Sequence, residues 1–291
     1  MSILAFLAQT IRIAVPYLFA AAGGVVAERS GVISLGLEGY MLSGAFGGTV
    51  GAYYSGSPWV GLLCGAGTGL LCALIYALVS LRFRADQVVS GIAINLLVIG
   101  LTRFLLRLAF GSSSNSPRVA GFASGGASVG GALVRNPLIP FAVLLPAGLA
   151  WLVYRTPYGL RLRAVGEHPE AAETLGVRVR RVRLIAVGLS GILASLGGVY
   201  LALDQHQFTD EMTAGRGFIA LAAVIFGRWD PVRAAVACFF FAAAETLQIQ
   251  LQGTQLVASQ FIQMIPYVLT IVALAGVVGR AIPPAALGRA E

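Results

Sequence analysis

Carboxylates inside apolar runs are the residues of this sequence best able to do chemistry. Glu38 lies in SLGLEGYMLSG, and Glu245 lies in FAAAETLQIQLQ. An ionised group at the centre of a membrane-spanning helix costs at least ~2.5 kcal/mol, so it usually faces a cavity or a partner. Such a carboxylate can carry a proton, contact a polar solute or hold two helices together. The sequence leaves these roles open for both residues.

Other polar residues inside apolar runs belong to the same group of candidates. Gly36 and Gly39 flank Glu38, which indicates an interrupted helix, and discontinuous helices often form transporter binding sites. A polar residue that bridges two helices is equally common in membranes and is the alternative for each position. The candidates for a substrate pathway are Ser34, Glu38, Asn95, Glu245 and Gln263.

Enzymatic and metal chemistry find little support. All 20 basic residues are arginine, so the lysine of a Walker A phosphate loop and of a Schiff base is missing. Cys64, Cys72 and Cys238 are isolated within apolar runs, a spacing that fits neither a disulfide framework nor a zinc site. His168 and His206 fall in separate loops. We therefore expect no catalytic residue, no metal and no cofactor on this chain, and any ATP must be hydrolysed by another chain.

The charged residues gather in one stretch, 155–183, which contains HPEAAETLGVRVRRVR. Pro169 suits the first turn of a helix, and Glu170 is favoured there by the helix dipole. Gly176 is typical of a helix end. The pattern predicts a helix of about two turns over Pro169–Leu175, isolated between charged flanks.

A helix this short is marginal by itself in water and needs a surface to lie on. Ala171, Ala172 and Leu175 would form a small apolar face on it. That face could dock on a partner protein. It could equally lie on lipid headgroups, with the arginines near phosphate.

The composition predicts the elements that must position these residues. The chain of 291 residues is 57% hydrophobic and 11% charged, against about 25% charged in soluble domains. We therefore predict an all-α, polytopic membrane helix bundle forming one domain, 1–291. Its net charge of +8 does not indicate nucleic-acid binding, because the arginines lie in short stretches between apolar runs. Apolar runs occupy 3–27, 33–54, 58–81, 87–109, 136–154, 184–203, 217–227, 232–251 and 261–279.

These runs predict about nine transmembrane helices, within a range of eight to ten and with some broken or short. The run 217–227 has about half the ~20 residues that a span needs. Positive residues mark cytoplasmic loops, which places 155–183 inside, the N-terminus out and the C-terminus in the cytoplasm. The Ser- and Gly-rich stretch 111–135 becomes an external loop. The N-terminal run has no basic residues before it and is expected to stay as the first span.

Several stretches together resemble one family. EAAETLG at 170–176, within GLRLRAVGEHPEAAETLGVRV, is similar to the cytoplasmic signature of ABC importer permeases in its branched-chain amino acid, ribose and nucleoside version. Four other stretches resemble the nucleoside or simple-sugar branch of this family: AERSGVISLGLEGYMLSGAFGG, DQVVSGIAINLLVIGLTRFLL, MTAGRGFIALAAVIFGRWDP and PYVLTIVALAG. Ser34 departs from the pattern, which usually has Asn there.

The resemblance implies a transport subunit, not an enzyme, that moves nucleosides or related simple sugars across the cell (inner) membrane. It implies three protein partners: an ATPase with two nucleotide-binding domains that binds ATP and Mg, a second homologous permease and an extracytoplasmic substrate-binding lipoprotein. The acidic stretch 204–216 is a candidate contact for that receptor, and an ordinary solvated loop is the alternative. Membrane lipid is the remaining partner. The residues implied to couple to the ATPase are Pro169, Glu170, Ala171, Ala172, Leu175 and Gly176.

The main alternative is a secondary transporter driven by an ion gradient, with Glu38 or Glu245 as proton carrier. A mutation in the Walker motif of a partner ATPase would stop uptake in the first case, and an uncoupler would stop it in the second.

Overall fold

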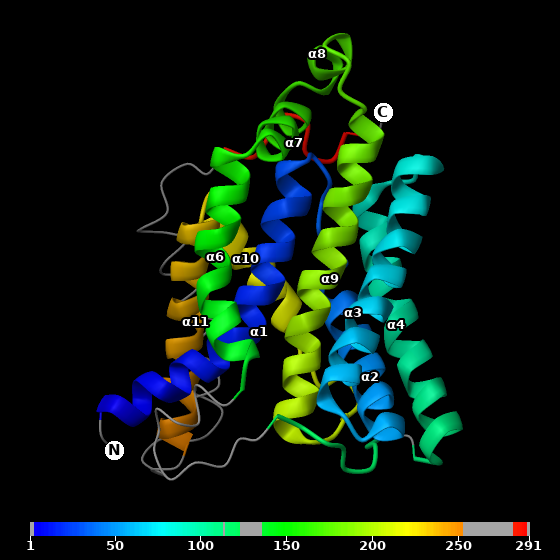
Figure 1. Ribbon diagram of the computed structural model, residues 1–291, viewed down its shortest axis with the longest axis vertical. Helices are drawn as coiled ribbons and strands as arrows, with labels where there is room; N and C mark the ends of the chain where they lie inside the picture. The colour runs from blue at the N-terminus through cyan, green and yellow to red at the C-terminus, as the bar shows by residue number, and fades with distance from the viewer. Residues whose placement is uncertain (1–2, 113, 123–135, 253–281, 290–291) are drawn as a thin grey trace.

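The computed structural model describes residues 3–112, 114–122, 136–252 and 282–289, and every regular element within these ranges is a helix (Figure 1). The helices are α1 (Ile3–Arg29), α2 (Leu37–Ser55), α3 (Pro58–Ala77), the π-helix η1 (Leu78–Arg82), α4 (Gln87–Phe110), α6 (Leu138–Arg155), α7 (Pro157–Glu167), α8 (Pro169–Thr174), α9 (Val179–Gln205), α10 (Arg216–Phe226) and α11 (Pro231–Gln252).

Six of the described helical segments are long and apolar enough to cross a membrane: α1, α3 with η1, α4, α6, α9 and α11. The helix α2 has 19 residues but is rich in glycine, and α10 has only 11. Each apolar run predicted within the described residues is largely helical, although the run 33–54 is helical only from Leu37 and the run 58–81 divides into α3 and η1. The last run, 261–279, lies outside them, so the number nine stays a prediction. The chain is thus a multi-pass, all-helical membrane bundle.

The centre of the bundle is formed by α2 and α9, which pack on each other and on α3. Small residues make this packing close: a Cβ at Gly198 of α9 would overlap the carbonyl oxygen of Met41 in α2. A Cβ at Gly44 would meet the backbone of Ser195 in the same way. Without a hydrophobic drive between helices in lipid, such close approach supplies van der Waals contact. The glycines of the apolar runs therefore set the core geometry.

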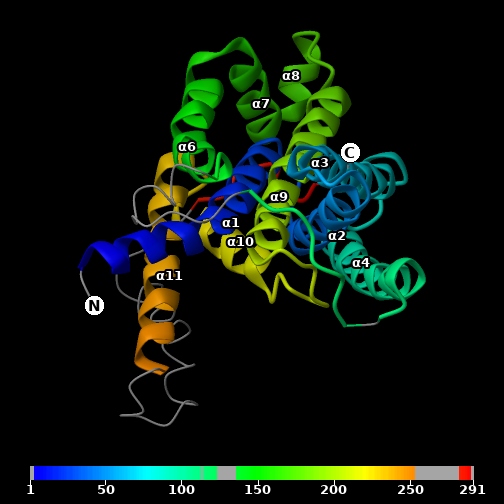
Figure 2. The same cartoon turned by 60° about the horizontal axis from the view of Figure 1, so that its bottom comes forward.

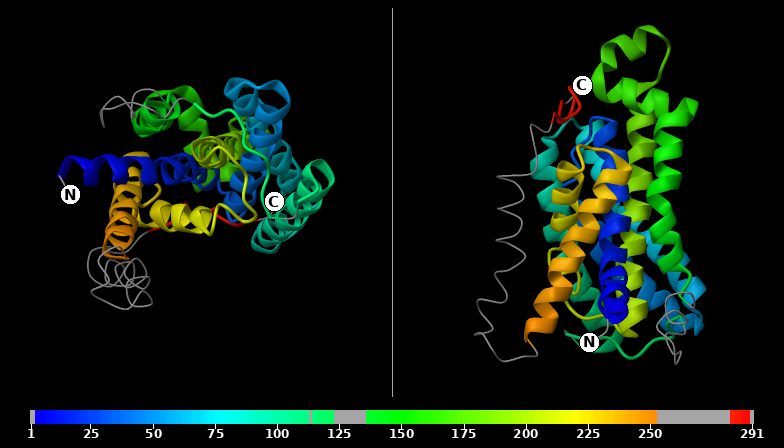
Figure 3. Two further views of the ribbon diagram at one scale, coloured as in Figure 1. Left: turned by 90° about the horizontal axis from the view of Figure 1, so that it is seen from below. Right: turned by 90° about the vertical axis from the view of Figure 1, so that its left-hand side faces the viewer.

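The two ends of the bundle carry different elements (Figures 1 and 3). The helices α7 and α8 project at one end, where the segment 282–289 also lies and where the backbone N–H of Ala286 donates to the carbonyl of Gly166 (2.9 Å). The first turns of α1 lie toward the opposite end. There the segment 114–122 runs beside the end of α9, and Val119 N donates to the carbonyl of His206 (2.8 Å).

The close contact at Gly198 generates the first prediction. Gly198→Leu should strongly reduce the amount of folded chain, because the side chain would have to displace the backbone of α2, and overpacking a core costs ~1–3 kcal/mol or more. Gly67→Leu is the matched control, since open space surrounds Gly67 on the exposed side of α3. The yield of monodisperse protein in detergent measures the effect. Equal yields would contradict the packing role.

Candidate functional site

The segment between α1 and α2, residues 30–36, is non-helical and largely buried. The backbone N–H of Ile33 donates to Oε1 of Gln87 (2.8 Å), and the carbonyl of Ile33 accepts from the hydroxyl of Tyr76 (2.7 Å). Non-helical backbone is tolerated at membrane depth only where it is buried in protein or lines a cavity. Neighbouring helices thus supply the partners that this break needs, and the interruption expected beside Glu38 is confirmed.

Asn95 of α4 stabilises the other side of the break. Its Nδ2 donates to the carbonyl of Leu35 (2.9 Å), and its Oδ1 accepts from the backbone N–H of Gly39 (2.8 Å). Both ends of the amide are therefore engaged with α2 and the residues before it. Asn95 is buried, and the structure places it in a bridging position between two helices.

Ser34 pairs with a carboxylate that the sequence analysis did not single out. The hydroxyl of Ser34 donates to Oε1 of Glu28 (2.9 Å), and the indole N–H of Trp229 donates to Oε2 of the same side chain. Glu28 and Ser34 are each 3% exposed. Glu28 directly follows an apolar run and precedes Arg29, so the local sequence does not indicate burial. The fold nevertheless buries this side chain.

Glu38 holds the N-terminus of α10. Its Oε1 accepts from the hydroxyl of Thr213 (2.6 Å) and from the N–H of Gly215 (2.9 Å), and its Oε2 accepts from the N–H of Gly217 (2.7 Å). A carboxylate at a helix N-terminus satisfies orphan N–H groups and meets the positive end of the dipole. The geometry matches the helix-bridging alternative for Glu38.

The C-terminal end of α10 is held by the end of α1. Nε of Arg29 donates to the carbonyl of Trp229 (2.8 Å), while Glu28 accepts from the indole of the same residue. The helices α1 and α10 lie against each other, with α11 beside them (Figure 2). Two carboxylates flanking the α1–α2 break, Glu28 and Glu38, thus bracket one short helix.

Glu245 of α11 also contacts the start of α10. It accepts from Nη2 of Arg216 (2.9 Å) and from the hydroxyl of Tyr17 in α1. Ser34, Glu38, Asn95 and Glu245 are therefore brought together around the α1–α2 break and α10. Gln263, the remaining pathway candidate, lies outside the described residues.

The charged stretch 155–183 contains α7, α8 and the first residues of α9, where the sequence predicted one short helix. The predicted helix is α8, which ends one residue earlier than expected, at Thr174. Gly176 has a φ of +80°, which suits the residue after a helix end. The helix α7 was not expected, although Thr156 caps it by accepting from Gly159 N (3.1 Å) and Leu162 faces inward.

The expected docking face on α8 is divided by the fold. Ala171 is exposed and Leu175 is 85% exposed, four residues apart on one side. Ala172 is only 3% exposed, and Pro169 is buried as well. These residues are three positions apart and therefore share one face of α8, and this face packs against α7 and α9. Ala172 therefore does not belong to the exposed face. Glu170, Glu173 and Gly176 remain exposed.

The stretch 155–183 touches the α1–α2 break directly. A Cβ at Gly166 of α7 would overlap the carbonyl oxygen of Arg29, so the two backbones lie in close contact. Arg183 of α9 donates from Nε to the carbonyl of Ser30 (3.2 Å) and from Nη1 to that of Arg289 (3.4 Å). A displacement of α7 or α9 would therefore reach the break without an intermediate element.

Acidic residues at the opposite end are paired with arginines from the spans. Arg103 contacts Asp210 (2.6 Å) and Glu211 (2.7 Å), and Arg12 contacts Asp204 (3.0 Å). These pairs fix the stretch 204–216 against α1 and α4.

Glu38→Gln should weaken the anchoring of α10, because the amide nitrogen cannot accept the hydrogen bonds that one carboxylate oxygen receives. Loss of a hydrogen bond to a charged group costs ~1.5–3 kcal/mol, which should lower the midpoint of thermal unfolding in detergent. Glu211→Gln is the control, since this side chain is half exposed at the surface. An unchanged midpoint together with lost uptake would instead assign Glu38 to the permeation path.

Comparisons with known proteins agree on one family. The model of the branched-chain amino acid transport system permease component matches residues 6–274. A guanosine ABC transporter permease protein of Bacillus subtilis is 39% identical over 96% of this chain and 93% of its own length. A nucleoside ABC transporter permease protein of Lactococcus lactis is 38% identical over 94% and 92%.

A solved structure shares the fold. It is described as an inward-facing conformation of a metal-chelate type ABC transporter, with a TM-score of 0.53, 17% identity and coverage of 92% of this chain and 85% of that one. The relatives are ABC permeases, which favours this class over an ion-gradient-driven transporter. The chain therefore belongs to the family of branched-chain amino acid transport system permease components and is a transport subunit of an ABC transporter.

Proposed function

We propose that this permease subunit imports nucleosides, or related simple sugars, across the cell (inner) membrane. The similarity to guanosine and nucleoside permeases over nearly the whole chain carries the choice of cargo. A pathway containing Ser, Asn and Gln side chains suits an uncharged solute with many hydrogen-bonding groups. In the described part of the chain, however, Ser34, Glu38 and Asn95 are engaged with protein groups. We therefore assign them to holding the broken helices and expect the cargo to pass beside them.

The proposed topology has nine membrane passes, with the N-terminus outside and the C-terminus in the cytoplasm. The six long apolar helices, α2, α10 and the predicted span 261–279 make up the nine. The positive-inside rule supports the orientation, because the arginine-rich stretch 155–183 and the segment 282–289 lie at the same end. The external loop 111–135 then lies at the other end of a single domain, 1–291.

The coupling element in this proposal is α8. Its exposed Ala171 and Leu175 would dock on a separate ATPase that binds ATP and Mg and has two nucleotide-binding domains. An isolated two-turn helix gains stability from such a surface. Closure of the ATPase would displace α8 with α7 and α9, and the contacts Gly166–Arg29 and Arg183–Ser30 would pass the displacement to the α1–α2 break. This continuity of contacts is the observation that carries the mechanism.

Two further partners complete the assembly that we propose, since a permease of an ABC transporter works with other components. A second homologous permease would form the other half of the pathway. An extracytoplasmic lipoprotein would deliver the cargo to the stretch 204–216, which pairs with 114–119 and is held by Arg12 and Arg103. The fixed acidic residues there give a receptor a rigid surface.

Leu175→Arg should abolish uptake while the chain still inserts and the ATPase still hydrolyses ATP, because the leucine is exposed and supports no internal contact. Leu160→Arg on α7 is the control, as this leucine is also exposed (62%) at the same end. Ala172→Arg would be a poorer test, since it would disrupt α8 itself. Uptake and ATPase activity are measured together in proteoliposomes of the whole complex. Normal coupled uptake by Leu175→Arg would refute the docking role.

Uptake by a deletion strain that carries this chain with its partners should be highest for labelled nucleosides in a panel that includes simple sugars. A Walker-motif mutation in the ATPase should stop uptake, whereas an uncoupler should leave the initial rate unchanged while ATP is maintained. Preference for another class of solute would overturn the cargo. Sensitivity to the uncoupler with indifference to the Walker mutation would overturn the mechanism.

A further inference from the structure

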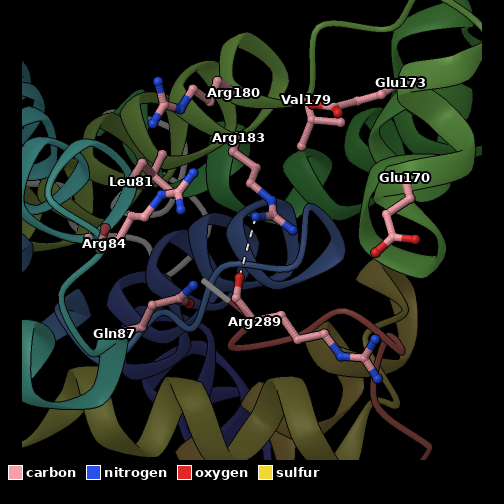
Figure 4. Close-up of a pocket in the computed structure, with 10 residues that line it drawn as sticks. Leu81, Arg84, Gln87, Glu170, Glu173, Val179, Arg180, Arg183 and Arg289 are labelled. Carbon is pink, nitrogen blue, oxygen red and sulfur yellow. Dashed lines mark hydrogen bonds between the residues drawn. The ribbon is translucent and has the colours of Figure 1, made fainter. Parts of the chain in front are cut away.

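A cavity of about 220 Å³ opens at the α7–α8 end of the molecule (Figure 4). It is bounded by η1, the beginning of α4, α8, the beginning of α9 and the segment 282–289. Its charged lining residues are Arg84, Arg180, Arg183, Arg289, Glu170 and Glu173. Four arginines against two glutamates leave an excess of positive charge, and Figure 4 shows both glutamates on the side away from Arg84.

Gln87 provides a buried donor in the lining of this cavity. Its side chain is only 3% exposed, and its Oε1 accepts from the backbone of Ile33. Its Nε2 has no hydrogen-bond acceptor among the residues that the structure describes. A buried donor without an acceptor costs free energy, so an oxygen-bearing anion in the cavity would be stabilised by this amide as well as by the arginines.

An apolar groove of about 380 Å³ adjoins the cavity. It is lined by Leu74 and Ala77 of α3, Leu78, Leu81 and Arg82 of η1, and Arg180 and Leu184 of α9. Leu81 and Arg180 line both spaces, so the charged cavity and the groove are contiguous. Leu78 is 51% exposed and Leu184 is 42% exposed, which places the groove on the outer surface of the bundle.

We propose that the cavity and the groove form one binding site for an anionic phospholipid. The phosphate of the headgroup would accept hydrogen bonds from Arg84, Arg180 and Gln87, and an acyl chain would lie along the groove. Basic pockets between transmembrane helices at the cytoplasmic side are suited to anionic headgroups. A free phosphate would satisfy the cavity but would leave the apolar groove uncovered, so the groove favours the lipid.

The position of this site connects the two parts of the transport mechanism. Glu170 and Glu173 of α8 line the cavity, and Gln87 fixes Ile33 in the α1–α2 break. A bound anionic lipid would therefore lie in the same cavity as two carboxylates of the coupling element and would restrain the amide that holds the break. Its assignment to the cytoplasmic leaflet rests on the proposed orientation, whereas binding itself does not.

Native mass spectrometry of the whole transporter complex can measure the retention of phosphatidylglycerol, with phosphatidylcholine as the zwitterionic comparison. We expect stronger retention of phosphatidylglycerol, and a reduction of about fivefold in affinity for each of Arg84→Gln and Arg180→Gln. Arg161→Gln is the control, because this exposed arginine of α7 lies at the same end but lines neither space. Thermal unfolding in phosphatidylcholine checks that each variant is folded.

Inorganic phosphate is the second probe, and it separates a lipid from a small anion. Leu184→Trp should fill the groove and reduce the retention of phosphatidylglycerol. It should not change the weak ability of inorganic phosphate to compete with the lipid for the cavity. Equal retention of the two lipids by the wild-type complex would overturn the proposal, as would a loss that Arg161→Gln reproduces. If Leu184→Trp left the retention of phosphatidylglycerol unchanged, the cavity would be a small-anion site instead. Nucleoside uptake is measured separately, so failure here leaves the proposed cargo standing.

Discussion

The architecture depends on the burial of two carboxylates beside an interrupted helix. Glu38 accepts three hydrogen bonds at the start of α10. Glu28 accepts a hydrogen bond from the indole N–H of Trp229, which lies just beyond the end of α10. A helix of 11 residues is too short to cross a bilayer alone and leaves polar backbone at its termini. Each carboxylate offsets its own desolvation by receiving several donors, and α10 gains a fixed position in return.

The same break depends on several other helices for its hydrogen bonds. A helical segment would satisfy its backbone groups internally and would need no partners. The segment 30–36 instead takes its partners from α1, α3, α4 and α9, so its conformation depends on how those helices sit. The tight contact between Gly166 and Arg29 adds α7 to this set. The proposed coupling element therefore lies close to the α1–α2 break through its contacts with α7 and α9.

The glycines of α2, α3 and α9 allow the backbones of these helices to touch in the core. Backbones in contact, as at Gly198 and Met41, leave little room for side-chain adjustment. Close backbone contacts therefore set how α2, α3 and α9 pack, whereas side-chain hydrogen bonds hold α10 and the segment 30–36 in place. The ion pairs of Arg12 and Arg103 at the other end hold the stretch 204–216 in place against α1 and α4.

Local sequence patterns predicted the protein class and the approximate bounds of most described helices, α8 among them. These features depend only on local sequence: the apolar runs, the absence of lysine and the EAAETLG motif. Each apolar run within the described residues forms helix over most of its length. The tertiary structure decided which polar residues meet. Glu38 and Gly217 are 179 residues apart, and Glu28 and Trp229 are 201 apart. It also turned Ala172 inward and folded α7, because burial is set by neighbouring elements that a local pattern does not contain.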